Sequence, residues 1–371
     1  MSSVLTDLFP HPIVQAPMAG GVSVPQLAAA VSDAGGLGFL AAGYKTADGM
    51  YQEIKQLRGL TSRPFGVNLF LPQPETPGAS TGSAGAADAS PSNAAVDVYA
   101  HQLAGEAAWY ETELGEPESC GDDGYDAKLA VLLEDPVPVV SFHFGVPARE
   151  VIDSLHRVGT LALVTATTAE EARAVERAGA DVVIAQGVEA GGHQGTHRDV
   201  PETDGSGIGL LSLVAQVRES VGIPVVAAGG IMRGGQIAAV CAAGASAAQL
   251  GTAFVPAHES GAHALHKQAL TNPLFARTEL TRAFTGRPAR ALVNRFLREH
   301  GPYAPAAYPE VHHLTAPLRK AAAKAGDAQG LALWAGQGHR MARELPAGQL
   351  VEVLVAELAA ARTALSAGGA R

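Results

Sequence analysis

A histidine framed by glycines follows one of the apolar runs of this chain. Residues 187–197 read GVEAGGHQGTH, with four glycines and two histidines in eleven positions. A neutral imidazole at His193 can accept a proton from carbon, and a protonated one can hydrogen-bond an anionic oxygen. The glycines form either a flexible turn or a loop whose backbone passes close to a flat, anionic group, such as a cofactor. The two other glycine-rich turns described next favour the second alternative. We take His193 as the candidate catalytic residue and assign no function to His197.

Two further glycine-rich turns have the composition of a phosphate site. Gly229 and Gly230 end the run IPVVAAGG, and Gly251 and Thr252 lie in QLGTAF. Glycine lets backbone N–H groups approach an anion, and the following helix adds its positive N-terminal end. A tight turn between a strand and a helix also uses glycine, but two such turns on neighbouring strands favour phosphate binding.

Three side chains at the ends of other apolar runs suit the edge of a flavin ring. They are Met18, Asn68 and Gln186. Amide groups can pair with the hydrogen-bonding edge of an isoalloxazine. Because a buried amide needs partners, we favour function over ordinary loop hydrogen bonds for Asn68 and Gln186. Met18 is explained equally well as packing.

Most of the other histidines lack a supporting pattern. His143, inside SFHFG, is either a structural residue or part of a substrate pocket, and His312 and His313 form a pair that we expect to be solvated. No Cys, His and carboxylate cluster has the spacing of a metal site, and no Gly-x-Ser-x-Gly nucleophile turn is present. The remaining histidines are predicted to lie at the surface: His11, His101, His156, His197, His258, His263, His266, His300 and His339.

The elements that must position these residues are short apolar runs alternating with helical patterns. One helical pattern, 168–179, has Thr168 as a candidate N-cap with Glu171 three positions later. Each apolar run is largely apolar throughout, as expected for parallel strands buried on both faces. The alternation predicts an α/β fold, a (β/α)8 TIM barrel, whose active sites lie at the C-terminal ends of the strands. The runs are 12–17, 36–43, 64–70, 136–145, 160–167, 181–187, 223–230 and 247–254.

Two segments interrupt this alternation and suggest the domain organisation. Residues 72–96 are low-complexity Pro/Ala/Gly/Ser, predicted to be a mobile insertion in a barrel spanning 1–254. Residues 255–338 lose the strand–helix rhythm and are predicted to form a smaller, mainly helical second domain that caps the substrate site. Residues 339–371 are predicted to carry an amphipathic helix that returns to the barrel.

Composition excludes several classes of partner. The net charge is −10 and no basic run occurs, which argues against nucleic acid and anionic membranes. No apolar run approaches the roughly 20 residues of a spanning helix, and the N-terminus lacks the pattern of a secretory signal. Cys120 and Cys241 lie far apart and are predicted to be free thiols. We therefore expect a cytoplasmic protein, monomeric or homodimeric, acting on small molecules.

Taken together, these motifs resemble the nitronate monooxygenase family. The matching segments are QAPMAGG, PFGVNLF, SFHFG, VEAGGHQG, PVVAAGG and QLGTAF, with FTGRPARALVNRF and LWAGQG resembling the larger class I branch. The resemblance covers nearly the whole chain and implies an FMN-binding TIM barrel with a second domain and no metal. It implies oxidation of alkyl nitronates, such as propionate 3-nitronate, by O2 to a carbonyl compound and nitrite.

The resemblance also assigns residues. The active-site histidine of the family falls on His193, and substrate-pocket tyrosines fall on Tyr303 or Tyr308. Its FMN contacts fall on Met18, Asn68, Gln186, Gly191, Gly229, Gly230, Gly251 and Thr252, with Gln337 a further candidate at the ring.

Other functions remain open at this stage. An FMN-dependent NAD(P)H:quinone reductase or enoyl-acyl carrier reductase would use the same kind of barrel and would consume a nicotinamide. A flavin-free phosphate-binding barrel, such as an isomerase or an enzyme like IMP dehydrogenase, is a different class. The latter needs a cysteine in the loop after strand six, and residues 187–197 contain none. Nothing in the sequence argues for a non-catalytic flavin-binding protein.

Overall fold

The structure is a computed structural model that describes residues 5, 8–72, 91–117 and 122–368. Of the predicted low-complexity insertion, residues 73–90 lie outside this range. Residues 91–96 form the first turns of helix α3 (Pro91–Trp109), so the tail of the predicted insertion is helical.

Eight parallel strands form the barrel, and each of the eight predicted runs contains one of them. The order around the sheet is β1-β9-β8-β6-β5-β4-β3-β2. Strand β1 meets β2 through Gln15 N to Leu37 O and Leu37 N to Ile13 O, both 2.9 Å, which closes the ring. The predicted TIM barrel is therefore confirmed. Strand bounds are β1 Ile13–Gln15, β2 Gly38–Ala41, β3 Phe65–Phe70, β4 Val139–His143, β5 Leu161–Ala166, β6 Val182–Gln186, β8 Val225–Ala228 and β9 Ala247–Leu250.

Alternate residues of each strand face two different apolar layers. In β6, Val182 and Ile184 belong to a cluster that fills the barrel interior, whereas Val183 packs in the layer between strands and helices. Because side chains alternate along a strand, both faces must be apolar, which explains the unbroken apolar runs of the sequence.

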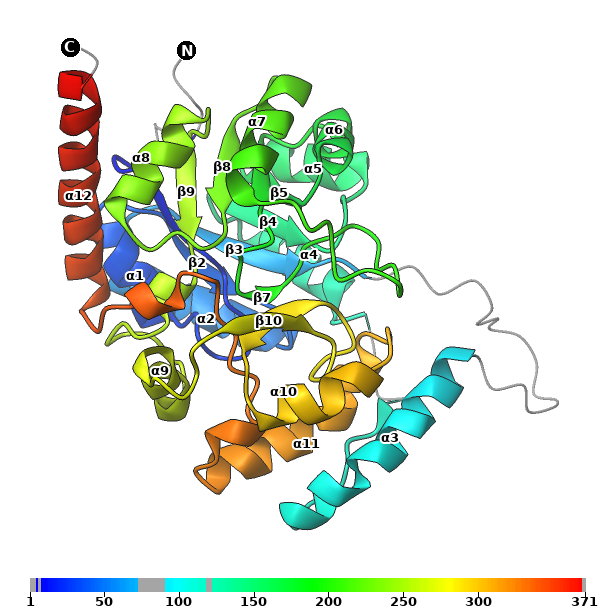
Figure 1. The fold of residues 1–371 in the computed structure, drawn as a ribbon. Coiled ribbons are helices and arrows are strands. Elements are labelled where there is room, and N and C mark those ends of the chain that lie inside the picture. The colour runs from blue at the N-terminus through cyan, green and yellow to red at the C-terminus, as the bar shows by residue number, and fades with distance from the viewer. Residues whose placement is uncertain (1–4, 6–7, 73–90, 118–121, 369–371) are drawn as a thin grey trace.

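Helices cover the outside of the barrel (Figure 1). The predicted cap of α6 is present: the Thr168 hydroxyl accepts from Glu171 N at 3.1 Å, and Gly179 ends the helix in the left-handed region. Helix α12 packs along α8 and α1. No helix within the described ranges is long and apolar enough to cross a membrane. The bounds are α1 Pro25–Asp33, α2 Ala47–Leu60, α4 Tyr125–Glu134, α5 Arg149–Arg157, α6 Ala169–Ala178, α7 Leu210–Ser220, α8 Gly234–Ala242 and α12 Ala347–Gly368.

A second group of elements lies beyond the C-terminal ends of the strands (Figure 1). It contains an antiparallel sheet in the order β10-β11-β7, in which β7 comes from the loop after β6. The 255–338 segment was expected to be mainly helical, and it contributes two strands of this sheet. The elements are β7 Gly192–His193, α9 Ala264–Thr271, β10 Thr278–Thr281, β11 Ala289–Leu292, α10 Arg295–His300 and α11 Glu310–Lys324, with 3-10 turns at Thr252–Phe254, Gly301–Tyr303, Ala328–Gly330 and His339–Met341.

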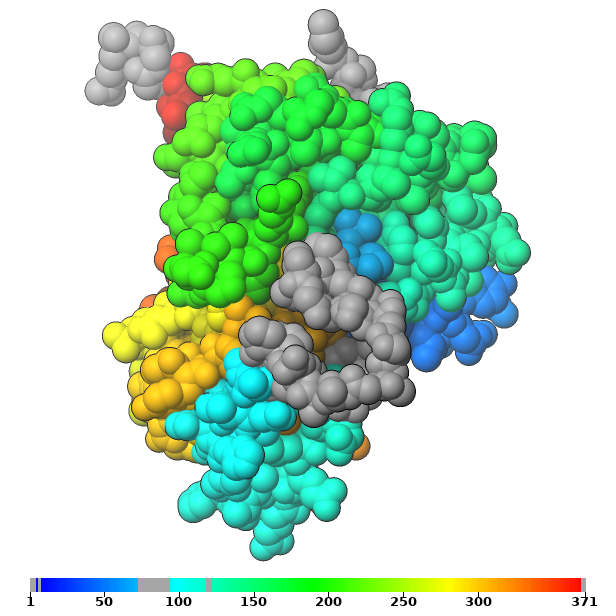
Figure 2. Space-filling model, turned by 90° about the vertical axis from the view of Figure 1, so that its right-hand side faces the viewer, coloured from blue at the N-terminus to red at the C-terminus, as the bar shows by residue number. Residues whose placement is uncertain are grey.

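Helix α3 packs on this second group, although the sequence analysis placed it in the barrel portion of the chain (Figures 1 and 2). The Tyr99 hydroxyl donates to Ala283 O at 2.8 Å, and Arg295 of α10 forms an ion pair with Glu106. These contacts join residues almost 190 positions apart, which no local pattern reveals.

The Arg295–Glu106 ion pair includes one member of a group of potential metal ligands. The structure brings Glu106, Glu299 and His300 close enough to share one ion. The Arg295 guanidinium donates to both carboxylates and lowers the pKa of Glu106, against the opposing effect of burial. Because a cation already compensates these charges, we assign the cluster a structural role between α3 and α10.

Candidate active site

One large cavity opens at the C-terminal ends of the barrel strands. Its empty space, including the mouth, is about 1190 Å³. Ten of the predicted site residues line it: Met18, Asn68, His143, Gln186, Gly191, His193, Gly229, Gly230, Gly251 and Thr252. Their convergence follows from the topology, because the ends of parallel barrel strands meet at one face.

Strand pairing fixes His193 at the edge of this cavity. As part of β7, His193 pairs with Ala289 of β11, and Gln194 N donates to Pro288 O at 2.8 Å. Gly192 and His193 of the loop after β6 are thus held as a short strand of the second sheet.

The amide of Gln186 holds the same loop from the barrel side. Its Nε2 donates to His193 O at 3.0 Å, and its Oε1 accepts from Gly195 N at 2.6 Å. Gln186 lines the cavity, but both of these hydrogen bonds are with atoms of the neighbouring loop. The sequence analysis had considered such loop hydrogen bonds as the alternative to a role at the cofactor. The structure therefore gives Gln186 a role in positioning the backbone on either side of His193.

The glycines of this loop allow close contacts within the protein itself. A Cβ at Gly191 would lie 2.5 Å from Gly336 N, and one at Gly195 would lie 2.6 Å from the His143 ring. Gly187 is crowded in the same way by Leu210. The sequence analysis attributed this glycine content to the passage of a cofactor, whereas the crowding observed is with backbone and side chains of the chain.

The His193 imidazole is enclosed by aromatic rings and a hydroxyl group. Its Nε2 lies 3.0 Å from Thr285 Oγ1, and its ring centroid is 5.5–5.6 Å from those of Phe144, Tyr308 and Trp334. Burial, reinforced by the positive charge of nearby groups, holds the pKa of His193 well below its usual value. The imidazole is therefore neutral at pH 7.

The titratable and charged groups that interact electrostatically with His193 come from several elements. They are His143 of β4, Arg287 from the turn before β11 and Arg319 of α11. Burial lowers the pKa of both guanidiniums to about 10, so they remain charged at neutral pH. The buried Arg287 and the partly buried Arg319 do not line the cavity, but their positive charge near His193 makes this end of it favourable for an anion.

An aromatic wall next to His193 contains Tyr308, one of the two candidate pocket tyrosines, together with Tyr44, which the sequence analysis did not anticipate. The Tyr44 and Tyr308 hydroxyls are 3.2 Å apart, and Tyr44 stacks on His312 with ring centroids 4.0 Å apart. Tyr44 and Phe144 both have positive φ, at 66° and 74°. Such backbone strain in non-glycine residues is concentrated at functional sites. We infer that these rings shape the space available to a substrate.

Several predicted residues lie elsewhere. Tyr303 is 61% exposed in a 3-10 turn, away from the cavity. The Gln337 side chain is exposed, and the residue contributes its backbone N, which donates to Glu189 O at 3.0 Å. Tyr308 does not line the cavity itself but contacts His193, which does.

The expected surface position is wrong for three histidines. His266, His300 and His339 are all at most 7% exposed. His266 lines the cavity, with Nε2 2.9 Å from Trp334 O, and burial lowers its pKa to about 4. The expectation of a solvated pair is also wrong for His312, which lies between Tyr44 and the Arg319 guanidinium.

Acid should destabilise the protein because the pKa values of two histidines, His266 and His143, are lowered by desolvation. The pKa of His266 is about 4 and that of His143 about 3, both lowered by burial, against about 6.5 in an unfolded chain. Between pH 6.5 and 4 the unfolded chain therefore binds more protons, so stability falls as the pH falls. Each group contributes at most about 1.4 kcal/mol per pH unit. We expect His266→Gln to reduce the slope of melting temperature against pH, and an unchanged slope would contradict the assignment.

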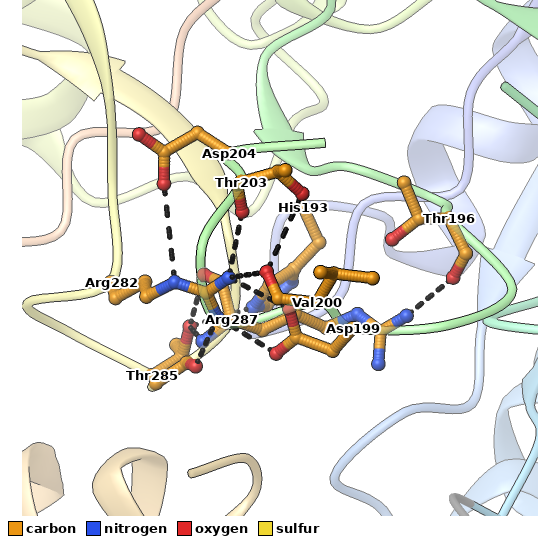
Figure 3. A network of polar contacts seen from close by, with 10 residues as sticks. His193, Thr196, Asp199, Val200, Thr203, Asp204, Arg282, Thr285 and Arg287 are labelled. Carbon is orange, nitrogen blue, oxygen red and sulfur yellow. Dashed lines mark hydrogen bonds and ion pairs between the residues drawn. The ribbon is translucent and has the colours of Figure 1, made fainter. Parts of the chain in front are cut away.

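A buried arginine anchors the chain that follows His193. Arg282 donates to both carboxylate oxygens of Asp199 at 2.8 Å, to Val200 O at 3.1 Å and to Thr203 O at 2.9 Å (Figure 3). Removing one partner of a buried pair is strongly destabilising. We expect Arg282→Met to lower the free energy of unfolding by about 3 kcal/mol in denaturant titrations.

The matched control is Arg277→Met. The Arg277 side chain is 69% exposed in its pair with Glu279, and we expect its loss to cost less than about 1 kcal/mol. Equal effects of the two substitutions would show that Arg282 does not anchor the loop.

Comparison with known proteins places this architecture in a family. The nitronate monooxygenase family model matches residues 2–357. The chain belongs to the nitronate monooxygenase family. This membership confirms the family predicted from the motifs and makes the protein an oxidoreductase.

Individual nitronate monooxygenases are similar over nearly their full length. The enzyme of Pseudomonas aeruginosa is 45% identical over 94% of this chain and 96% of its own. The enzyme of Paraburkholderia phytofirmans is 40% identical over 94% of this chain and 92% of its own.

Solved structures extend the comparison. Nitroalkane oxidase from Streptomyces ansochromogenes is 81% identical, with a TM-score of 0.92 over 98% of this chain and 100% of its own. FabK from Thermotoga maritima is 31% identical, with a TM-score of 0.73 over 99% of both chains. Within the nitronate monooxygenase family, the cavity beside His193 is therefore the candidate active site.

Proposed function

We propose that this protein binds FMN and oxidises alkyl nitronates, such as propionate 3-nitronate, with O2 to a carbonyl compound and nitrite, a detoxifying reaction. The observation that carries this proposal is a neutral His193, near the positive charges of Arg287 and Arg319, at the edge of a cavity in a chain of the nitronate monooxygenase family. The 81% identity to a nitroalkane oxidase supports a nitro compound as substrate.

The residues present fit FMN. Asn68 Nδ2 donates to Ser141, which leaves its amide oxygen for a donor in the cavity. A Cβ at Gly251 would approach nothing nearer than Ala16 at 3.5 Å and Met18 Sδ at 3.7 Å. Because Ala16 and Met18 both line the cavity, a side chain at Gly251 would fill space that a ligand can use.

The FMN phosphate is proposed to lie at the turn formed by Gly229 and Gly230. Gly229 and Gly230 have φ of 135° and 67°, conformations that expose backbone N–H groups and that other residues rarely adopt. The neighbouring helix α8 contributes less than expected, because Gly234 N donates to Glu357 Oε2 at 2.8 Å. The Thr252 hydroxyl accepts from Gly336 N at 2.9 Å and can still donate its own hydrogen.

Bound FMN would supply the capacity to accept electrons from the substrate. The chain would supply binding and orientation: the cations Arg287 and Arg319 favour an anionic nitronate over a neutral molecule. His193 would hold the nitronate oxygens, or accept the α-proton if a neutral nitroalkane binds. The rings of Phe144, Tyr308 and Trp334 would exclude water from the same space.

A reductase is the second candidate. It is favoured by the 31% identity and 0.73 TM-score with FabK. Such an enzyme would bleach its flavin anaerobically on addition of NADH or NADPH, which a nitronate oxidase would not need. Higher identity to nitronate monooxygenases makes nitronate oxidation the stronger proposal.

The first test is the visible spectrum of the purified protein. We expect a flavin spectrum, and heat-released cofactor that comigrates with FMN. A colourless protein that takes up no FMN on reconstitution would contradict the cofactor assignment.

A further inference from the structure

Three side chains of one short turn contact the segment that follows β6, residues 187–203, which contains His193. This segment is called the His193 loop below. The turn, residues 282–288, connects β10 to β11 and carries Arg282, Thr285 and Arg287 (Figure 3). Arg282 binds Asp199 and the carbonyls that follow it, Arg287 donates to Thr196 O, and Thr285 meets the imidazole of His193. Side chains of the turn therefore bind backbone carbonyls of the His193 loop, and one of them also contacts the imidazole of His193.

The hydroxyl of Thr285 lies between an imidazole nitrogen and a backbone carbonyl. Thr285 Oγ1 is 3.0 Å from His193 Nε2 and 3.3 Å from Arg287 O. A hydroxyl has one hydrogen to donate, and a carbonyl oxygen can only accept. Both contacts are hydrogen bonds only if Thr285 donates to Arg287 O and accepts from an Nε2–H of His193.

This arrangement fixes the tautomer of a neutral ring. Burial and nearby positive charge keep His193 neutral, so the ring carries one hydrogen, which the contact with Thr285 places on Nε2. The structure shows no hydrogen-bond partner for Nδ1 among the residues it describes, and His193 lines the cavity. Nδ1 is then the unprotonated nitrogen available to a ligand.

We propose that Thr285 is a positioning residue that holds His193 in its Nε2–H tautomer and presents Nδ1 to the substrate. The inference rests on the proposed role of His193 in nitronate oxidation. Thr285 is 2% exposed and does not line the cavity, so it acts through His193 and not on the substrate.

Hydrogen bonds also hold the backbone on both sides of Thr285. Thr315 of α11 donates to Phe284 O at 2.6 Å, and Arg282 donates to Gly286 O at 3.0 Å. These bonds lie on both sides of Thr285 and restrain the turn. A hydroxyl held in one position can select one tautomer of His193, whereas a mobile hydroxyl could hydrogen-bond to either tautomer.

The test measures the tautomer directly, by ¹⁵N NMR of the purified enzyme labelled at histidine, with His193→Asn identifying the His193 signals. We expect protonated Nε2 and unprotonated Nδ1 in the native protein and in Thr285→Ser. In Thr285→Val we expect mixed tautomers and a kcat about 10- to 100-fold lower at similar KM. Thr281→Val is the control, because its hydroxyl bonds Ala283 N in the same turn and does not touch His193.

A native His193 protonated at Nδ1 would overturn the proposal, as would Thr285→Val with native tautomer and kcat. If Thr285→Val fails to fold, the native and Thr285→Ser spectra still decide. Because the tautomer is read without turnover, its result stays separate from failure of the proposed nitronate oxidation.

Discussion

His193→Asn should lower kcat for nitronate oxidation by roughly 10²–10⁴ while leaving FMN bound. Asparagine keeps a polar side chain but cannot accept a proton at neutral pH, and its shorter amide cannot reproduce both the Thr285 contact and the free Nδ1. The cofactor should stay because Met18, Asn68 and the glycine turns are separate from the imidazole.

The control for this substitution lies four residues further along. His197 does not line the cavity, and its Nε2 bonds Thr165 O at 2.8 Å. His197→Asn should therefore change kcat much less. The measurements are steady-state nitrite release and the ratio of flavin to protein. Normal turnover in His193→Asn, or equal losses in both variants, would show that the catalytic assignment is wrong.

Gly191→Ala should destabilise the protein and release the cofactor. The new Cβ would lie 2.5 Å from Gly336 N and 2.6 Å from Ala335 C, which are backbone atoms that cannot rotate away. The two segments must separate, which strains the nearby bonds of Gln337 N to Glu189 O and Gly336 N to Thr252 Oγ1. We expect a loss of about 1–3 kcal/mol in the free energy of unfolding and reduced FMN occupancy.

Gly235→Ala is the matched control. Gly235 lies in helix α8, and a Cβ there meets nothing within 4 Å. Alanine at this position should be neutral or stabilising by up to about 1 kcal/mol. Thermal melts and flavin absorbance measure both effects. A Gly191→Ala protein with native stability and full FMN content would contradict the crowding described for this loop.

The barrel and most of the cavity could be predicted because their signals are local. Each strand is a run of apolar residues, and strand order then brings Asn68, Gln186 and His193 together without any knowledge of side-chain contacts. The clustering of the predicted residues at one face therefore follows from periodicity and connectivity.

The remaining residues depend on contacts between distant segments. Tyr44 meets Tyr308, 264 positions away, and Trp334 meets His193 from 141 positions away. Tyr303 and Tyr308 lie five positions apart on one irregular segment, and no periodicity indicates which of them turns inward. The buried position of His266 and the partly buried position of His312 were missed for the same reason, because they depend on how the second group of elements packs on the barrel.

The most direct test is simultaneous measurement of O2 consumption and nitrite release when the FMN-loaded protein is given propionate 3-nitronate, with NADH and NADPH tested separately under anaerobic conditions. The proposal predicts nitrite formation with O2 uptake and no appreciable flavin bleaching by either nicotinamide. Rapid bleaching by NADH or NADPH, with no nitrite formed from the nitronate, would contradict it and support a reductase.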